Sequence, residues 1–248
     1  MVRRQAAPPS TKRLQGKIAL VTGATRGLGL AMARALATEG SSVVICGRDT
    51  KALKSAEKEL SQKGSNVLAR SCDVRNEADV QGLLTATRDR FAKLDILINN
   101  AGIGHAASNV EDLSSRVWQE VIETNLTALF LVAKHALPLM QAGATIVNNL
   151  SVSAKRVFPG SAAYTASKFG GLGFTNTLRE EIRPRGIRVI ALLPGAIDTE
   201  IWDTLWPDAP RQKMMTADSV AQAVLDAILL PESTVLEELT VMPVGGAL

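Results

Sequence analysis

Short runs of apolar, often β-branched residues alternate with longer stretches of helical periodicity along almost the whole chain. The runs predict strands at Ile18–Thr22, Ser42–Cys46, Asn66–Ser71, Asp95–Asn99, Thr145–Leu150, Arg188–Leu193 and Leu239–Met242. Most are apolar at consecutive positions, which is typical of strands buried on both faces. Helical patterns fall near residues 28–39, 51–63, 77–92, 112–140, 162–183 and 217–229. We therefore predict a doubly wound α/β fold, with a single parallel sheet of about seven strands and helices on both faces.

No stretch rich in Pro, Gly or Ser divides the chain, and no repeat recurs at a fixed period. We expect a single domain over residues 14–248, preceded by a disordered basic N-terminal arm over residues 1–13. The arm contains Arg3, Arg4, Lys12 and Arg13 and accounts for the net charge of +4, because the remainder has 24 basic and 24 acidic residues. Nucleic-acid binding needs basic side chains clustered on a folded face, so we expect no nucleic-acid partner.

Cysteine and histidine are scarce in this sequence. Cys46 and Cys72 are the only cysteines, and His105 and His135 are the only histidines. Neither pair has the spacing of a disulfide framework, a metal site or a Cys/His nucleophile. Low cysteine usage fits a reducing environment, and no window approaches ~18 consecutive apolar residues. We therefore expect a cytoplasmic protein with no bound metal and no membrane partner.

A glycine-rich segment, Thr22–Gly29, joins the first predicted strand to the first predicted helix. Glycine permits the sharp turn and the close approach of phosphate oxygens, and the start of the helix supplies free N–H groups. The preceding strand and the following helix are the context that supports a dinucleotide-binding motif. The spacing G-x-x-x-G-x-G lacks the Gly-Lys-Ser/Thr of a P-loop, which disfavours a kinase.

The end of the second strand indicates which dinucleotide binds, because the ribose 2′ position lies there. A carboxylate at this place favours NAD. Here the strand ends in Gly47-Arg48, where glycine would open space and Arg48 could clamp a 2′-phosphate. Arg26 could approach the same phosphate from the glycine-rich segment. We therefore favour NADP(H) over NAD(H).

Tyr164 and Lys168 lie one helical turn apart on one face of a predicted helix. A neighbouring ammonium favours the phenolate, so we expect Lys168 to lower the pKa of Tyr164 toward neutrality. Ser151 follows the fifth predicted strand, at the sheet edge where open α/β sheets bind ligands. The three side chains together predict proton transfer to or from a substrate oxygen.

In type and order, these motifs resemble those of the short-chain dehydrogenase/reductase family, over about residues 14–245. The resemblance implies a Rossmann fold. It also implies that Tyr164 and Lys168 contact the cofactor. Further cofactor contacts are implied for residues that follow the first, second, third, fourth and sixth predicted strands: Gly23, Thr25, Arg26, Gly27, Leu28, Gly29, Arg48, Asp73, Val74, Asn100, Ala101, Gly102, Pro194, Gly195, Ile197 and Thr199.

The same resemblance implies a catalytic set of Asn125, Ser151, Tyr164 and Lys168, acting while hydride passes between nicotinamide and a carbonyl carbon. Ser151 hydrogen-bonds the substrate oxygen, and Tyr164 is the general acid/base. Lys168 lowers the tyrosine pKa and binds the nicotinamide ribose. Asn125 links Lys168 to solvent through a water molecule.

Residues 195–216 form a long irregular segment, which we interpret as an active-site lid. Bulky side chains there and after the fourth and fifth strands form the predicted substrate pocket: His105, Val152, Phe158, Trp202, Leu205 and Trp206. Their character predicts a bulky apolar or aromatic ketone, reduced by an NADP-dependent carbonyl reductase or alcohol dehydrogenase.

Two alternatives stay open. A 3-oxoacyl-(acyl-carrier-protein) reductase needs a basic docking patch for its acidic partner. The sequence has no Lys or Arg between Lys134 and Lys155, although Arg179, Arg183 and Arg185 could substitute. A non-catalytic NADP-binding redox sensor would share the fold, but the complete catalytic set argues against it.

Small residues in the predicted helix 162–183 would permit another helix to approach closely: Ala162, Ala163, Ala166, Gly170, Gly171 and Gly173. The family resemblance implies a four-helix interface, and we expect a homotetramer.

Overall fold

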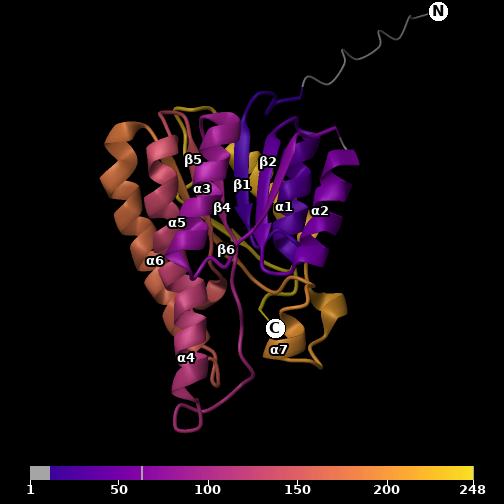
Figure 1. Ribbon diagram of the computed structural model, residues 1–248. Coiled ribbons are helices and arrows are strands. Elements are labelled where there is room, and N and C mark those ends of the chain that lie inside the picture. The colour runs from indigo at the N-terminus through magenta and orange to yellow at the C-terminus, as the bar shows by residue number, and fades with distance from the viewer. Residues whose placement is uncertain (1–11, 63, 248) are drawn as a thin grey trace, which may run out of the picture.

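The computed structural model describes residues 12–62 and 64–247 and contains one parallel sheet of seven strands in the order β3-β2-β1-β4-β5-β6-β7 (Figure 1). The strands are β1 (Ile18–Thr22), β2 (Ser42–Gly47), β3 (Val67–Ser71), β4 (Ile96–Asn99), β5 (Thr145–Asn149), β6 (Arg188–Pro194) and β7 (Glu238–Val241). The helices are α1 (Gly27–Thr38), α2 (Thr50–Gln62), α3 (Glu77–Phe91), α4 (Ser115–Ile122), α5 (Ala128–Ala136), α6 (Ala162–Ile182), α7 (Trp202–Leu205) and α8 (Ala217–Ile228). The predicted fold class is confirmed.

Helices cover both faces of the sheet because its strands are apolar on both sides. In β1, Ala19 and Val21 pack into a core formed with α1, α2 and α8. Ile18 and Leu20 of the same strand point the other way, into a core formed with α3, α5 and α6. Alternate side chains of one strand therefore anchor the helices of both layers.

The predicted helix over residues 112–140 is interrupted in the structure. A π-helical turn, Glu123–Thr127, separates α4 from α5, and a 3₁₀ turn, Leu137–Leu139, follows α5. Such π turns occur frequently at functional sites. This one places Asn125 in the buried interior, where its side chain bonds the backbone of Ile103.

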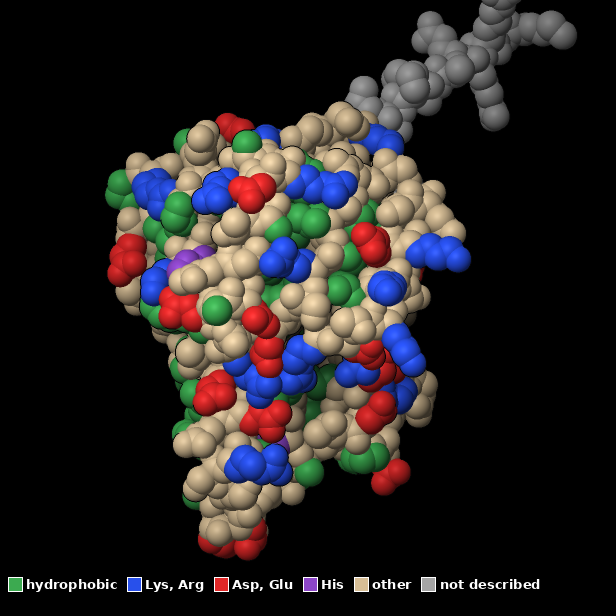
Figure 2. Space-filling view, viewed as in Figure 1, with side chains coloured by type: hydrophobic (Ala, Val, Ile, Leu, Met, Phe, Trp, Pro, Cys, Tyr) green, Lys and Arg blue, Asp and Glu red, His purple; other side chains and the backbone are tan. Residues whose placement is uncertain are grey.

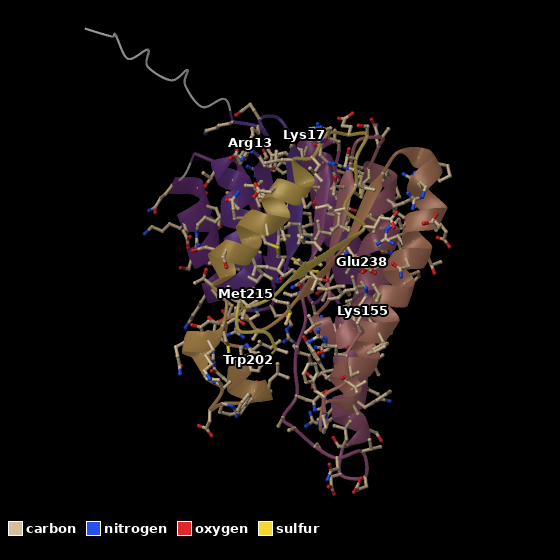
Figure 3. All side chains as sticks on the ribbon, turned by 180° about the vertical axis from the view of Figure 1, so that it is seen from behind. Arg13, Lys17, Lys155, Trp202, Met215 and Glu238 are labelled. Atoms are coloured by element: carbon tan, nitrogen blue, oxygen red, sulfur yellow. The ribbon has the colours of Figure 1, made fainter. Side chains whose placement is uncertain are left out.

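The segment 195–216, predicted to be irregular, contains α7 and a 3₁₀ turn, Arg211–Lys213. Its two ends are clamped together: Asp198 N donates to Met215 O and Met215 N donates to Ala196 O. Arg211 crosses the segment and binds Asp198, the carbonyl oxygen of Thr199 and Asp203. In Figure 3, Met215 lies about half-way down the molecule from Arg13, and Trp202 lies farther from Arg13.

Residues 1–11 of the predicted arm lie outside the described residues. Arg13 belongs to the folded body, since its guanidinium binds Glu39 at the end of α1 at 2.8 Å. Leu14 follows it and is buried in the core. In the part of the chain that the structure describes, no helix combines the length and apolarity needed to cross a bilayer.

Because all seven strands are parallel, their carboxyl ends lie at one edge of the sheet. In the sheet, β2 and β3 lie on one side of β1, and the strands from β4 onward lie on its other side, so the strand order reverses between β1 and β4. Ligands of open parallel sheets bind at the carboxyl edge where the strand order reverses in this way. The predicted site residues follow these strand ends.

Candidate active site

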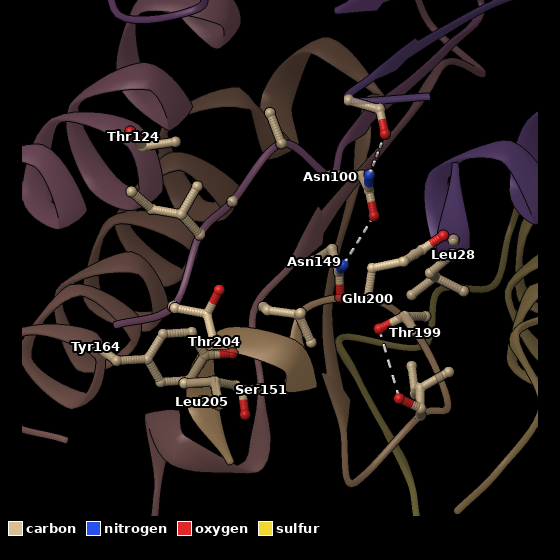
Figure 4. A pocket seen from close by; sticks show the side chains of 18 of the residues that line it. Leu28, Asn100, Thr124, Asn149, Ser151, Tyr164, Thr199, Glu200, Thr204 and Leu205 are labelled. Carbon is tan, nitrogen blue, oxygen red and sulfur yellow. Dashed lines mark hydrogen bonds between the residues drawn. The ribbon is translucent and has the colours of Figure 1, made fainter. Parts of the chain in front are cut away.

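A single cavity of about 970 Å³ runs along the carboxyl edge of the sheet. It is lined by Ser151, Tyr164 and Lys168 and by every predicted cofactor and substrate-pocket residue. Asn125 is the one predicted site residue that does not line it. In Figure 4, Tyr164, Ser151 and Leu205 lie toward one end of the cavity, and Leu28, Thr199 and Glu200 lie toward the other.

The glycine-rich segment has no space for larger residues. A Cβ atom on Gly29 would lie 2.4 Å from Asn100 Nδ2 and 2.4 Å from the carbonyl oxygen of Gly23. Helix α1, which begins here, has no side-chain cap and no acidic residue in its first turn. Its free N–H groups and positive dipole end therefore face the cavity, as a phosphate site requires.

The predicted phosphate clamp has a different local arrangement from the one expected. Gly47 does not open space, because a Cβ atom there would lie 2.6 Å from Thr25 Cγ2. Instead, its lack of a side chain lets Thr25 pack against β2. Arg26 and Arg48 are exposed at the rim of the cavity. Within residues 12–62 and 64–247, no carboxylate lies within ion-pair distance of either guanidinium.

In the wall of the cavity, Arg75 binds the carboxylate of Asp73. Its Nη2 lies 2.6 Å from Asp73 Oδ2, and this hydrogen bond lowers the pKa of Asp73. The sequence prediction included Asp73 and Val74 but missed Arg75. The Asp73 backbone is engaged as well, because its N–H donates to Asp79 Oδ2 at 2.9 Å and its carbonyl oxygen accepts from Asn76 N.

Tyr164 and Lys168 project from α6 into the cavity. Lys168 Nζ lies over the Tyr164 ring, 5.4 Å from its centroid, and donates to the carbonyl oxygen of Asn149 at 3.2 Å. Ser151 Oγ accepts a hydrogen bond from Ser153 N, which fixes the hydroxyl just after β5.

The expected lowering of the tyrosine pKa is wrong for this structure. Desolvation by burial raises the pKa of Tyr164, and a hydrogen bond with Ser151 offsets this in part. Burial also lowers the pKa of Lys168 to about 8. The two groups share a desolvated environment that disfavours both charged forms, which the helical spacing alone does not reveal.

Asn125 lies behind the wall of the cavity and hydrogen-bonds the backbone of the lining residue Ile103. Its Oδ1 accepts from Ile103 N at 2.8 Å, and its Nδ2 donates to Ile103 O and to Ser167 Oγ. A Cβ atom on Gly102 would lie 3.3 Å from Asn125 Oδ1 and 3.8 Å from Lys168 Nζ. Asn125 and Lys168 therefore border the same short stretch of backbone.

Residues of the segment 195–216 line the cavity. Leu205 packs so closely on Gly104 that a Cβ atom there would lie 2.5 Å from Leu205 Cδ2. Trp202 donates its indole N–H to Ile197 O, which anchors α7, and Trp206 is exposed. His105 is buried in the wall, where Nδ1 bonds Ala106 O and Nε2 has no partner among the described residues.

The polar residues of the cavity that sequence reasoning missed include Asn149 and Glu200. Asn149 ends β5, and the pair Asn148-Asn149 at the end of an apolar run was an available signal. Glu200 comes from the segment 195–216, and its Oε2 would lie 3.4 Å from a Cβ atom on Gly27 at the start of α1. Nothing in the local sequence indicates that approach. Figure 2 shows that Lys, Arg, Asp and Glu side chains intermingle on the face it presents.

Known proteins of similar sequence include a 3-oxoacyl-[acyl-carrier-protein] reductase of Synechocystis, 38% identical over 195 residues, covering 77% of this chain and 78% of that protein. A 3beta-hydroxysteroid dehydrogenase of Mediterraneibacter gnavus is 39% identical over 193 residues, covering 76% and 69%. Among solved structures, an alcohol dehydrogenase from the archaeon Thermococcus sibiricus complexed with 5-hydroxy-NADP is 30% identical, with a TM-score of 0.86 over 92% of this chain and 97% of that one. Other similar structures hold NADP or NADPH.

The family model described as short chain dehydrogenase matches residues 17–210, which include the glycine-rich segment and the Ser151, Tyr164 and Lys168 side chains. This match spans most of the chain, and the relatives match over most of their own lengths. With the seven-stranded parallel sheet and the cavity at its carboxyl edge, it shows that the chain belongs to the short-chain dehydrogenase/reductase family and is an oxidoreductase.

Proposed function

We propose that the protein is an NADP(H)-dependent oxidoreductase that transfers hydride between nicotinamide and a carbonyl or secondary alcohol. One observation carries this proposal: the Ser151, Tyr164 and Lys168 side chains and the start of α1 open into the same cavity of about 970 Å³. A continuous cavity of this kind lets one ligand reach both the phosphate site and the proton-transferring groups.

The residues present fit NADP(H). Gly29 has no room for a side chain, the N-terminus of α1 is uncapped, and Arg26 and Arg48 are exposed at the rim. Together they offer backbone N–H groups for a pyrophosphate and two guanidinium groups for a 2′-phosphate. The similar solved structures that hold NADP, NADPH or 5-hydroxy-NADP support the same cofactor.

When bound, the nicotinamide supplies or accepts the hydride. Ser151 holds the substrate oxygen by a hydrogen bond, and Tyr164 gives that oxygen a proton during reduction or removes it during oxidation. The raised pKa of Tyr164 keeps the phenol protonated at neutral pH, which suits the donor role. Lys168 holds the ribose, and Asn125 holds the Ile103 backbone and a water that links Lys168 to solvent.

The substrate that we propose is a bulky apolar or aromatic ketone. The cavity is lined by Val152, Phe158, Trp202, Leu205 and Trp206, and Leu205 lies toward its Tyr164 end (Figure 4). These side chains offer apolar surface and few charges. The similarity to a 3beta-hydroxysteroid dehydrogenase is consistent with a large apolar substrate.

A 3-oxoacyl-(acyl-carrier-protein) reductase is the second candidate, favoured by the similarity to the Synechocystis enzyme. The arginines that could dock an acidic carrier are poorly placed for it. Arg183 binds Glu180 and Glu237, and Arg185 binds the carbonyl oxygens of Leu137 and Met140. Both arginines follow the carboxyl end of α6, whereas Tyr164 lies in its first turn. The helix has 21 residues and is about 30 Å long, which separates the arginines from Tyr164.

A homotetramer remains our proposal for the assembly. Helices α4, α5 and α6 expose Trp118, Phe130 and Phe169, which suit a helical interface. Gly170 and Gly171 are explained within the chain, because Cβ atoms there would meet Leu126 and Leu150. A clean monomer in light scattering at micromolar concentration would contradict this assembly.

The test of function is a panel of ketones and aldehydes, followed by the absorbance of reduced nicotinamide with NADPH and NADH in parallel. We expect turnover of bulky aryl or polycyclic ketones with NADPH. Preference for acyl-carrier thioesters would support the second candidate. Tight NADPH binding without turnover of any carbonyl compound would favour a redox sensor.

A further inference from the structure

An amide relay runs from the end of β1 to the wall of the cavity. Asn100 Nδ2 donates to the carbonyl oxygens of Thr22, at 3.0 Å, and Gly23, at 3.1 Å. Because carbonyl oxygens only accept, these bonds fix which end of the Asn100 amide is nitrogen. Asn100 Oδ1 therefore faces Asn149, whose Nδ2 donates to it at 2.9 Å (Figure 4).

The relay leaves Asn149 Oδ1 as an acceptor without a donor. Since Nδ2 is engaged by Asn100, the other end of the Asn149 amide must be oxygen. That atom is buried and has no hydrogen-bond partner within the described ranges. Burial of an unpaired polar atom is unfavourable, and such an atom calls for an explanation, for instance a ligand that supplies the missing donor.

Asn149 stands between the two functional ends of the cavity. Its side chain reaches β1 and the glycine-rich segment through Asn100, and its carbonyl oxygen accepts from Lys168 Nζ. It lines the cavity two residues before Ser151. A dinucleotide with its phosphates at α1 and its reacting ring near Tyr164 must place its nicotinamide half beside this residue.

We propose that Asn149 Oδ1 accepts a hydrogen bond from the nicotinamide half of the cofactor, from a ribose hydroxyl or from the carboxamide N–H. The inference rests on the proposed NADP(H) binding. Asn149 is then a cofactor-positioning residue, which orients the nicotinamide half while α1 and the arginines hold the phosphates. Both candidate donors share the chemistry of an O–H or N–H group, and the experiment separates them.

The test compares Asn149→Leu with the unchanged protein by calorimetric titration with NADPH and with 2′,5′-ADP, which has the phosphorylated adenosine half but no nicotinamide. We expect NADPH to bind about tenfold more weakly to the variant, the usual effect of one lost hydrogen bond, and 2′,5′-ADP to bind equally. Equal loss for both ligands, or no loss for NADPH, would overturn the inference. Failure of the unchanged protein to bind NADPH would instead remove the proposed function.

A third ligand distinguishes the two candidate donors. In 3-acetylpyridine adenine dinucleotide phosphate, an acetyl group replaces the carboxamide and removes its N–H. If the carboxamide is the donor, Asn149→Leu weakens NADP binding but not binding of this analogue; if the ribose is the donor, it weakens both.

The matched control is Asn148→Leu. Asn148 is the preceding residue, and its side chain is buried on the opposite face, where it bonds Asn99 and Thr175. We expect this control to lower Tm and to leave the ratio of NADPH to 2′,5′-ADP affinity unchanged. A control ratio shifted as in Asn149→Leu would overturn the assignment.

Discussion

Lys168 Nζ lies over the face of the Tyr164 ring, 5.4 Å from its centroid, and its hydrogen bond goes to the backbone of Asn149. The ammonium is thus held beside the phenol by the sheet and the helix together. Its placement carries a desolvation cost, which lowers the pKa of Lys168 to about 8. This relationship has a measurable consequence for stability.

We expect Lys168→Met to raise the free energy of unfolding at pH 7, by roughly 1–3 kcal/mol. Below pH 8, Lys168 is charged in both the folded and the unfolded protein, so the cost of burying the charge is fully present. As pH rises from about 8 through the ordinary lysine value of 10.5, that cost disappears, and the difference between the proteins shrinks. Urea denaturation at several pH values measures it. Lys54→Met, an exposed change on α2, should show no such trend.

Tyr164→Phe should leave the Kd for NADPH nearly unchanged and lower kcat by at least ~100-fold, because the ring is kept and the exchangeable proton is lost. Steady-state kinetics and fluorescence titration measure the two quantities. Thr165→Val, whose hydroxyl bonds Ser161 and does not line the cavity, is the control. Activity retained in Tyr164→Phe would refute the proton-donor role.

Arg48→Ala should weaken NADPH binding by roughly 10- to 100-fold and leave NADH binding unchanged, since only NADPH has the 2′-phosphate. The exposed Arg70 on β3 does not line the cavity, so Arg70→Ala removes the same charge as a control. An equal loss for the two cofactors would show that Arg48 does not select the phosphate.

Glu200→Gln should tighten NADPH binding severalfold at low salt. The Glu200 carboxylate lies at the start of α1, where the proposal places the pyrophosphate, and two negative groups there repel each other. The gain should shrink as ionic strength rises. Asp208→Asn changes an exposed charge in the same segment outside the cavity and should have no effect. Weaker binding by Glu200→Gln would mean that the carboxylate assists the cofactor.

Deletion of residues 1–11 should change neither the kinetics of the proposed ketone reduction nor Tm, in line with the proposal that the catalytic domain begins near residue 14. Deletion of residues 1–13 should leave the kinetics nearly unchanged and lower Tm slightly, because it removes the bond between Arg13 and Glu39. Thermal unfolding and ketone turnover measure both. A large loss of activity in either case would show that the arm belongs to the catalytic fold.

The apolar runs of the sequence predicted all seven strands, because a two-faced buried strand has a recognisable composition. The glycine-rich segment and the Tyr164/Lys168 spacing were also readable, since each depends on neighbours in the chain. The break between α4 and α5 was not. The π turn allows Asn125 to reach Ile103, and that contact joins residues 22 positions apart.

The sequence by itself determined the order of strands and helices along the chain and the family, and it supplied the side chains that we propose for phosphate binding and proton transfer. Only the tertiary structure decided their environments. It desolvated Tyr164 and Lys168 and thereby moved both pKa values, and it placed Glu200 at the start of α1. Among the described residues, it also left Asn149 Oδ1 without a hydrogen-bond donor. Pattern and propensity act over a few residues, whereas burial and charge depend on segments that meet only when the sheet is complete.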